Sequence, residues 1–251
     1  VYVTAPASRV KKPLKQLLAF ERLKEDMPFG RTITSVGWKI APLINGCVRY
    51  GSSQEQKDMF RAMLGIEEDV IYQPRRKHKE DPKPMPEIHS LQWDVARNLV
   101  NIKSRQDTEV RKFVKELDAT IKDKELDKNS VIFVDGTKVL TKGTVSGLVA
   151  NKLTSTYFRP VVLMRAKNSE EYGGSMRNYS SGALENLKGL LEQAGITVMG
   201  HENAAGVLFK KTDLQNIIDK CNELLPLDSL CTIHDCDWEI PANKLKREQV
   251  Q

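Results

Sequence analysis

Two short clusters of glycine and small polar residues are the part of the sequence best suited to chemistry. They read EYGGSMRNYSSG (171–182) and ITVMGHENAAGV (196–207), and each adjoins a β-like run. Glycine lets a backbone approach a ligand without a Cβ in the way, and serine and asparagine provide short hydrogen bonds. Arg177 adds a planar fork of donors, and His201 adds a donor near neutral pH. We expect these clusters to hold a phosphate or a sugar edge; the alternative is two glycine-rich turns of an α/β domain.

Basic residues are unevenly distributed along the chain, which has 39 Lys and Arg against 33 Asp and Glu and a net charge of +6. They gather near the start, in a run at 75–79, and near the end at 244–247. A basic surface favours a polyanionic partner, because neutralised phosphates release counterions. The middle run lies among prolines, and we interpret it as an exposed linker that either touches nucleic acid or is only solvated.

The composition is that of an ordinary soluble protein, with 40% hydrophobic and 29% charged residues in a chain of 251, which permits one or two domains. No apolar run approaches the ~20 residues that a membrane helix needs, so we expect no membrane partner. The chain starts at Val1 without the pattern of a secretory signal, and we expect a processed or truncated chain. Its four cysteines form no CxxC pair and no zinc spacing, which predicts reduced thiols in the cytoplasm.

The sequence predicts two regions of different character joined by a long helix. Residues 1–72 show apolar residues at helical spacing, interrupted by proline and glycine in a loop-like stretch at 37–51. Residues 73–88 form a proline-rich basic linker. Residues 89–127 carry apolar residues at helical spacing without proline or glycine. About 35 helical residues would span roughly 50 Å and could join two bodies.

Residues 128–251 predict an α/β domain with a mixed β-sheet flanked by helices. The first three elements form a βαβ unit: a strand at 131–136, an amphipathic helix at 144–158 and a strand at 159–166. The next strand ends in GGSMRN, and Ser180 or Ser181 then caps a helix that runs to Gln193. Three further strands and one helix complete the domain, the last strand at 231–240.

Four segments resemble the DHH phosphoesterase superfamily, and within it the RecJ-type single-strand exonucleases of the divergent kind found in phages. They are KIAPLINGCVRYG (39–51), SRQDTEVRKFVKE (104–116), GSMRN (174–178) and GHENAAG (200–206). In order, they resemble the family's APRINAAGR stretch, the start of its connecting helix, its SGRS-like segment and its GGHxxAAG motif. Met199 stands in place of the first glycine of the last motif. The resemblance covers nearly the whole chain and implies the C-terminal, substrate-binding half of such an enzyme with its connecting helix.

The resemblance also implies a set of residues that contact or support substrate. They are His201, Arg177, Ser175, Asn178, Gly200, Arg49 and Asn45. His201 and Arg177 would bind a phosphate. Ser175, Asn178 and Gly200 would support them. Arg49 and Asn45 would line the cleft between the halves. We expect His201 and Arg177 to project from neighbouring strand ends into one anion pocket, because phosphoryl chemistry needs fixed donors. Each residue also has a structural alternative. His201 could be a turn histidine, and Arg177 could form a surface ion pair. Asn45 could cap a chain reversal, and Arg49 could pack on its own helix.

The sequence departs from the family in two ways. Leu43 stands where the family has an arginine, and Gly46-Cys47-Val48 replace a small Ala-Ala-Gly run, so the number of phosphates bound is open. In the family, manganese ions held by an N-terminal half with a DHH triplet carry out hydrolysis, and no such motif occurs in this sequence. The cluster at 234–237 would place His234 and Cys236 on one side of a strand and two aspartates on the other, so we expect no metal site there.

The resemblance implies part of a phage-type single-strand-DNA exonuclease that works from 5′ ends in DNA recombination and repair. We expect Mn²⁺ (or Mg²⁺) in a missing N-terminal DHH half, with no catalytic residue assigned in this chain and no activity of the chain alone. Its partner would be single-stranded nucleic acid, DNA rather than RNA. Two alternatives remain open: a phosphodiesterase for short RNAs or cyclic dinucleotides, and a non-catalytic DNA-binding scaffold. An exonuclease should bind long strands with a salt dependence that grows with the contacts, whereas a dinucleotide enzyme should gain little from length.

Overall fold

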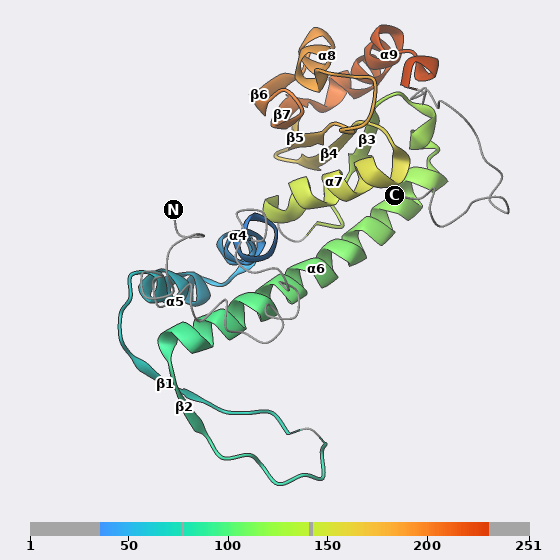
Figure 1. Ribbon diagram of the computed structural model, residues 1–251. Helices are drawn as coiled ribbons and strands as arrows, with labels where there is room; N and C mark the ends of the chain where they lie inside the picture. Colours follow the sequence, from blue (N-terminus) through green and yellow to red (C-terminus); the bar gives the residue numbers. More distant parts are fainter. Residues whose placement is uncertain (1–35, 77, 141–142, 231–251) are drawn as a thin grey trace, which may run out of the picture. The chain divides into compact units, whose positions relative to one another are not determined.

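The computed structural model describes residues 36–76, 78–140 and 143–230 (Figure 1). These residues fall into two compact units. The first unit takes the described residues up to Glu116 together with Leu140 and 143–149, and the second takes Leu117–Val139 and those from Ala150 onward. The predicted strand at 231–240, with its His/Asp cluster, lies outside the described residues. No helix in the described ranges has the length and apolar character needed to cross a bilayer.

The first unit is mainly helical and is built around one apolar core. Its helices are η2 (Val36–Ile40), α4 (Ala41–Tyr50), α5 (Ser53–Met63) and the first part of α6 (Leu91–Asp123). A capping box at Ser52 and Glu55 fixes the start of α5, because each side chain accepts a hydrogen bond from the other residue's backbone N–H. Buried residues of α4, α5 and α6 pack together, among them Leu43, Cys47, Met59, Leu99 and Ile102. The long helix predicted at 89–127 is present as the 33-residue α6.

The loop expected at 37–51 is wrong, because most of this stretch is the helix α4. Pro42 occupies one of the first two helical positions, where a missing N–H costs no hydrogen bond. Gly46 is buried within the helix, and a Cβ added there would lie 3.3 Å from Cδ of Lys103 on α6. Gly46 therefore allows α4 to pack closely on α6 rather than ending the helix.

The segment expected to be a linker at 73–88 is instead the connection of a β-hairpin. Strand β1 (Asp69–Tyr72) pairs antiparallel with β2 (Glu87–Ser90), with Val70 opposite His89 and Ile71 opposite Ile88. The four residues of β1 also correct the expectation that residues 1–72 contain only helices and a loop. The proline-rich basic stretch lies within the first unit and joins two paired strands of it, so it does not connect two bodies.

The second unit contains a mixed five-stranded sheet, which confirms the predicted α/β class. Its strands are β3 (Ile132–Asp135), β4 (Val161–Ala166), β5 (Glu171–Arg177), β6 (Thr197–His201) and β7 (Ala204–Lys210). The strand order is β3-β4-β5-β7-β6, and only β3 and β4 are parallel to each other. The helix α7 (Ser146–Tyr157) follows β3 and precedes β4, as the predicted βαβ unit requires.

The helix α8 (Leu187–Gln193) begins later than predicted. Asn186, rather than Ser180 or Ser181, caps it, since the side chain of Asn186 accepts a hydrogen bond from the backbone N–H of Gly189. The helix α9 (Leu214–Leu224) follows β7. Figure 1 shows α8 and α9 on one side of the sheet, where they close the larger core with Phe133, Met164, Met176, Leu191, Val207 and Ile217.

The opposite side of the sheet is covered unevenly. On β4 its residues Val161 and Leu163 have no exposed surface. On β5, β7 and β6 the residues of the same side are half-buried or exposed, and none of them is buried. We call this part of the sheet the open face; it consists of Gly173, Ser175, Arg177, Thr197, Met199, His201, Ala204, Gly206 and Leu208.

Candidate nucleic-acid interface

Arg177 and His201 lie on the same face of the sheet. Arg177 of β5 and His201 of β6 are both in register with Ala204 of β7, which runs between them. Residues directly opposite one another on neighbouring strands project to the same side. The expectation that the two side chains project from neighbouring strands is therefore wrong. The strands β5 and β6 lie two strand spacings apart, about 10 Å. A ligand that contacts both side chains must span this distance, which a phosphodiester or the edge of a nucleotide can do and a single oxygen atom cannot.

Small residues form the floor between these two side chains. Ser175 is in register with Gly206 and Met199, and Gly173 is in register with Leu208 and Thr197. Glycine and serine leave the backbone accessible at the centre of the open face. Met199, which replaces a glycine of the family motif, is 61% exposed and adds an apolar side chain to this surface.

Gly200 has a conformational role beside this site. Its φ of +139° is rarely adopted by residues with a side chain, and an added Cβ would lie 3.0 Å from Cα and Cβ of Ala205. Ala205 is buried and faces the helix-covered core. Gly200 therefore allows β6 to approach β7 closely and sets the position of the adjacent His201.

Asn178 ties together the two turns beside the open face. Its side-chain N–H donates to the carbonyl of Leu184 at 2.6 Å and to Oδ1 of Asn203 at 2.9 Å. Its backbone N–H donates to the carbonyl of Asn203 at 3.0 Å, and Nδ2 of Asn203 donates to the carbonyl of Glu185 at 2.8 Å. These bonds hold an open hollow of about 520 Å³, lined by Lys188, Gly200, His201, Glu202, Asn203 and Ala204. His201 is exposed at its edge.

A second arginine on this side of the sheet was missed in the sequence. Arg165 of β4 is in register with Gly173, and Gly173, Ser175 and Arg177 alternate onto the same side of β5. The Nε of Arg165 is buried and has no hydrogen-bond partner in the described part of the chain. The signal was available, since Arg165 breaks an otherwise apolar strand, VVLMRA. Arg165 and Arg177 thus place two guanidinium groups on β4 and β5, on the side of the sheet that carries the open face.

The other two predicted contact residues belong to the first unit. Asn45 and Arg49 are exposed on α4, four positions apart and so on one side of the helix. Leu43, which replaces an arginine of the family motif, is buried in the core of this unit. It therefore cannot contact a ligand at the surface.

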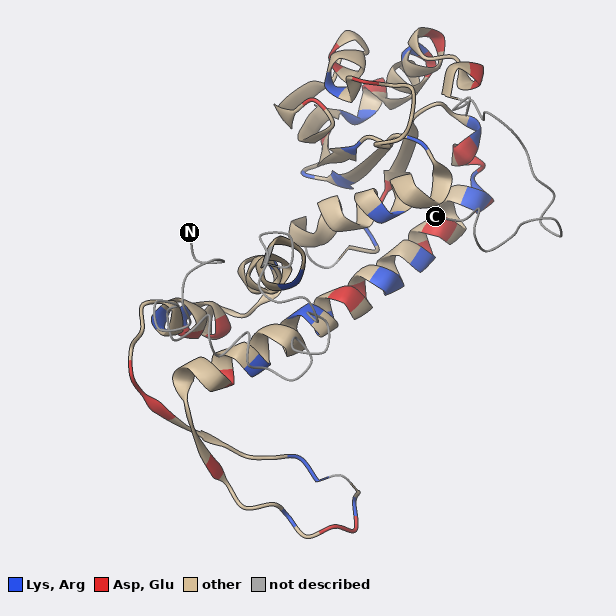
Figure 2. Ribbon diagram, viewed as in Figure 1, with Lys and Arg blue, Asp and Glu red and all other residues tan. Residues whose placement is uncertain are grey.

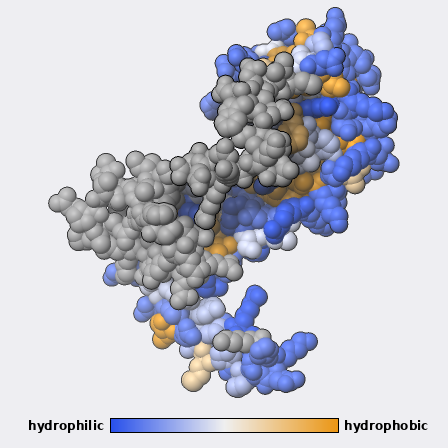
Figure 3. Space-filling view, turned by 45° about the vertical axis from the view of Figure 1, so that its right-hand side comes forward, coloured by the Kyte–Doolittle hydropathy of each residue, from blue (hydrophilic) through white to orange (hydrophobic). Residues whose placement is uncertain are grey.

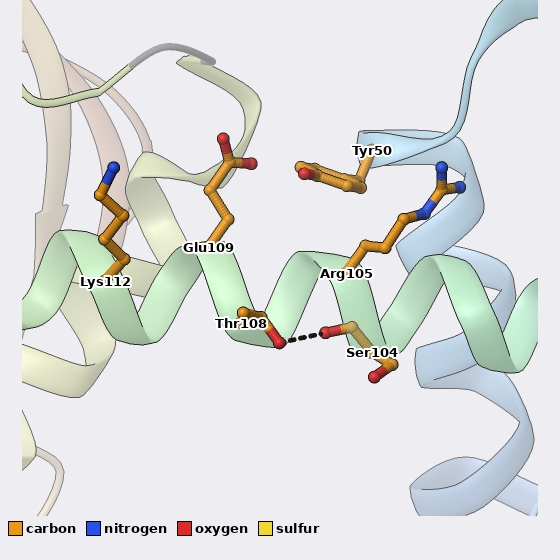
Figure 4. Close-up of a pocket in the computed structure, with 6 residues that line it drawn as sticks. All are labelled: Tyr50, Ser104, Arg105, Thr108, Glu109 and Lys112. Atoms are coloured by element: carbon orange, nitrogen blue, oxygen red, sulfur yellow. Dashed lines mark hydrogen bonds between the residues drawn. The ribbon is translucent and has the colours of Figure 1, made fainter. Parts of the chain in front are cut away.

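A pocket of about 440 Å³ lies between α4 and α6 in this unit (Figure 4). Its lining consists of Tyr50, Ser104, Arg105, Thr108, Glu109 and Lys112. Partial burial tends to raise the pKa of the Glu55 carboxyl, but hydrogen bonds from Ser52 and then from Arg105 outweigh this effect and lower the pKa. Arg105 donates to Oε1 of Glu55 at 2.5 Å. A hydrogen bond to Glu109, followed by burial, raises the pKa of Tyr50. Most of the lining residues come from the 104–116 segment of the family resemblance.

The described residues do not fit a divalent metal. Within 36–76, 78–140 and 143–230, no three His, Cys, Asp or Glu side chains converge as ligands. His89 stacks on Trp93 with ring centroids 3.6 Å apart, and Cys47 and Cys221 are buried free thiols. Burial raises the pKa of Cys221 to about 12, so its thiol stays protonated. His234 and its neighbours lie outside the described residues. No step of hydrolysis can therefore be derived from these residues.

Comparison with known proteins gives both a sequence relationship and a fold. No protein-family model matches the chain. Two curated relatives carry the name single-strand DNA-specific exonuclease YorK, one SPbeta prophage-derived in Bacillus subtilis strain 168 and one from Bacillus phage SPbeta. Each is 33% identical over 246 residues, which is 96% of this chain and 41% of the relative, so the chain spans less than half of their length.

Among solved structures, RecJ from Thermus thermophilus, in complex with Mg²⁺ or with Mn²⁺, is similar in fold. The TM-score is 0.50 at 17% identity, over 84% of this chain and 28% of that chain. The predicted resemblance is thereby confirmed. By sequence the chain is similar to two curated proteins named as single-strand DNA-specific exonucleases, and its fold is RecJ-like.

Proposed function

We propose that this chain is the substrate-binding part of a single-strand-DNA exonuclease and that the open face binds the strand. The observation that supports the proposal most is the row Arg177–Ala204–His201, which puts two donors on one side of a floor of small residues. Exonuclease relatives and a RecJ-like fold support the same substrate class. Digestion from 5′ ends and a preference for DNA over RNA belong to this proposal.

The residues of the open face would bind and orient rather than cleave. The Arg177 guanidinium, whose Nη1 donates to the carbonyl of Met176 at 2.6 Å, would bind a phosphate through further N–H donors of its planar fork, and the Ser175 hydroxyl and the His201 ring would each donate one bond. Arg165 would add positive charge beside Gly173. Such fixed donors place the phosphate without reorganisation at the moment of reaction.

We place the hydrolytic chemistry outside the described residues. A Mn²⁺ or Mg²⁺ ion would supply a water nucleophile and charge stabilisation when bound by a DHH-type half. RecJ of Thermus thermophilus has been solved with both ions, which supports this choice of metal. The 251-residue chain alone is accordingly expected not to hydrolyse DNA. Action in the cytoplasm, in DNA recombination and repair, is part of the same proposal.

The length dependence of binding tests this function. Fluorescence anisotropy would compare the chain's affinity for oligo(dT) of increasing length, for matched oligo(rU) and for a cyclic dinucleotide. We expect the affinity for oligo(dT) to rise with length and to fall linearly with salt on logarithmic axes, with a slope of about 0.7 per phosphate contacted. Binding of the cyclic dinucleotide as tight as that of the longest oligo(dT) would favour the alternative phosphodiesterase. Binding of neither would remove the proposed substrate class.

A further inference from the structure

The hairpin of the first unit, residues 69–90, projects from the helices as an arm (Figure 1). Its connection between β1 and β2 carries five Lys or Arg against two acidic residues. Figure 2 shows Lys and Arg along the far end of the arm, beyond the paired strands, in the part of the connection that the structure describes. We use the name arm for residues 69–90 throughout.

The described Lys and Arg residues of the arm form no ion pair with a described acid, unlike most of the Lys and Arg residues on the helix α6 next to it. Arg75, Arg76, Lys79 and Lys83 are exposed, and none forms an ion pair with any residue that the structure describes. The nearest acids do not neutralise them: Asp81 accepts a bond from the backbone N–H of His78 instead. On α6, by contrast, four basic residues pair with acids three or four positions away, in Arg97–Asp94, Lys103–Asp107, Lys112–Glu116 and Lys122–Asp118. The arm therefore presents positive charge that no acidic side chain among the described residues neutralises by an ion pair.

The arm is anchored to α6 through only one of its two faces. Tyr72 and His89 project from one face, where the ring of His89 stacks on Trp93 and Tyr72 meets Trp93 edge-on at 5.3 Å. The guanidinium of Arg97 lies 4.5 Å from the Tyr72 ring centre, within cation–π range. This aromatic cluster fixes the direction of the arm and covers one face of it.

The other face of the arm carries two exposed apolar side chains. Ile71 and Ile88 are cross-strand partners and are 78% and 72% exposed, and Met85 in the connection is 83% exposed. Figure 3 shows apolar surface among hydrophilic surface in the lowest part of the molecule, where the arm lies in Figure 1. Four prolines stiffen the connection, and Nε2 of Gln73 donates across it to the carbonyl of Pro84 at 2.7 Å. The arm is therefore a braced ribbon with cations at its end and apolar side chains along one face.

We propose that the arm is a second contact for single-stranded nucleic acid, separate from the open face. Its four cations would neutralise backbone phosphates, and Ile71, Ile88 and Met85 would lie against sugars and bases, whose faces are apolar. This combination of exposed cations and uncovered apolar surface matches a single strand, which exposes both phosphates and bases. The proposal rests on the proposed function, which supplies the polyanion, and it adds a second point at which a long strand is held.

The test compares two variants of the 251-residue chain that lose the same charge. The arm variant carries R75A, R76A, K79A and K83A, and the control carries K57A, K115A, K152A and K220A, all exposed lysines on helices. Affinity for a long oligo(dT) is measured by anisotropy over a range of KCl concentrations, after circular dichroism has shown that each variant is folded. We expect the arm variant to lower the salt slope by about 3, because each phosphate contact with a single strand contributes about 0.7.

The control is expected to change the slope by less than one contact. An equal change in both variants would overturn the proposal, because net charge alone would then explain the effect. A wild-type slope in the arm variant would overturn it as well while leaving the proposed function intact, whereas no binding by the wild-type chain would remove the proposed function itself. A further variant, I71S/I88S, should weaken binding with the salt slope unchanged. Poly-glutamate could also bind the arm. If it does so while the arm variant keeps the wild-type affinity for DNA, the arm would bind an acidic protein partner, and the proposal would be contradicted.

Discussion

Replacement of Arg177 by alanine is expected to weaken the binding of single-stranded DNA by about tenfold to a hundredfold. A hydrogen bond to a charged group contributes about 1.5–3 kcal/mol, and each ~1.4 kcal/mol is a factor of ten in affinity. Arg177 is suited to such a bond because it shares a row of the sheet with His201 above small residues. The measurement is the dissociation constant for oligo(dT) by anisotropy at one fixed salt concentration.

Two companion variants decide what the loss means. Lys220→Ala removes an equal charge from α9, on the other side of the sheet, and should leave affinity within about twofold of the wild type if only nearby charge matters. Arg177→Lys keeps the charge but not the planar fork, and should recover only part of the binding. Full recovery with lysine would show that no bidentate contact exists. An unchanged affinity in Arg177→Ala would contradict the role of the open face.

The second large effect is expected on stability, at Gly174. A Cβ added there would lie 2.2 Å from the carbonyl oxygen of Leu163 and 2.9 Å from Cα of Met164, both of which are backbone atoms of the paired strand. Neither atom can move without displacing β4. Overpacking typically costs about 1–3 kcal/mol, and a backbone clash belongs at the upper end of that range. We therefore expect Gly174→Ala to lower the free energy of unfolding by about 3 kcal/mol.

The neighbouring glycine is a matched control for this prediction. At Gly173 an added Cβ would meet nothing closer than 3.7 Å, which is ordinary van der Waals contact. Gly173→Ala should therefore leave the free energy of unfolding within about 1 kcal/mol of the wild type, and the lower chain entropy favours alanine slightly. Urea unfolding followed by circular dichroism compares the two. Equal stability of both variants would show that β4 and β5 do not approach as described.

The elements with strong periodicity could be predicted, and those defined by tertiary contacts could not. The long helix α6 and the βαβ unit follow directly from apolar spacing, since few alternatives satisfy it over so many residues. The helix α4 is not predicted because proline and glycine usually interrupt helices. Pro42 is harmless at the helix start, and Gly46 is required by the close approach of α6. The role of Gly46 is visible only with the partner helix in place.

The hairpin was missed because its strands are short and far apart. Each has four residues, and the connection between them carries the composition of a linker. No two-residue turn marks the reversal, which is the usual sequence signal of a hairpin. The aromatic contacts of Tyr72 and His89 with Trp93 hold the arm on α6, and they depend on side chains brought together by the fold.

The candidate site was predicted in its residues but not in its arrangement. Arg177 and His201 were identified from residue type and family resemblance. The insertion of β7 between their strands follows from the order β5-β7-β6, which local sequence does not encode. The sequence shows Arg165 as a charge in an apolar strand, but only the register of β4 with β5 places it on this side of the sheet.

The most direct measurement is the NMR footprint of single-stranded DNA on the isotope-labelled chain. Titration with a short oligo(dT) should shift the backbone amides of Gly173, Ser175, Gly206 and His201, which lie on the open face, at low DNA concentration. The amide resonances of α8 and α9, on the helix-covered side of the sheet, should not shift. Shifts confined to the helix-covered side, or absent from β5, β6 and β7 at saturating DNA, would contradict the claim that this face binds the strand.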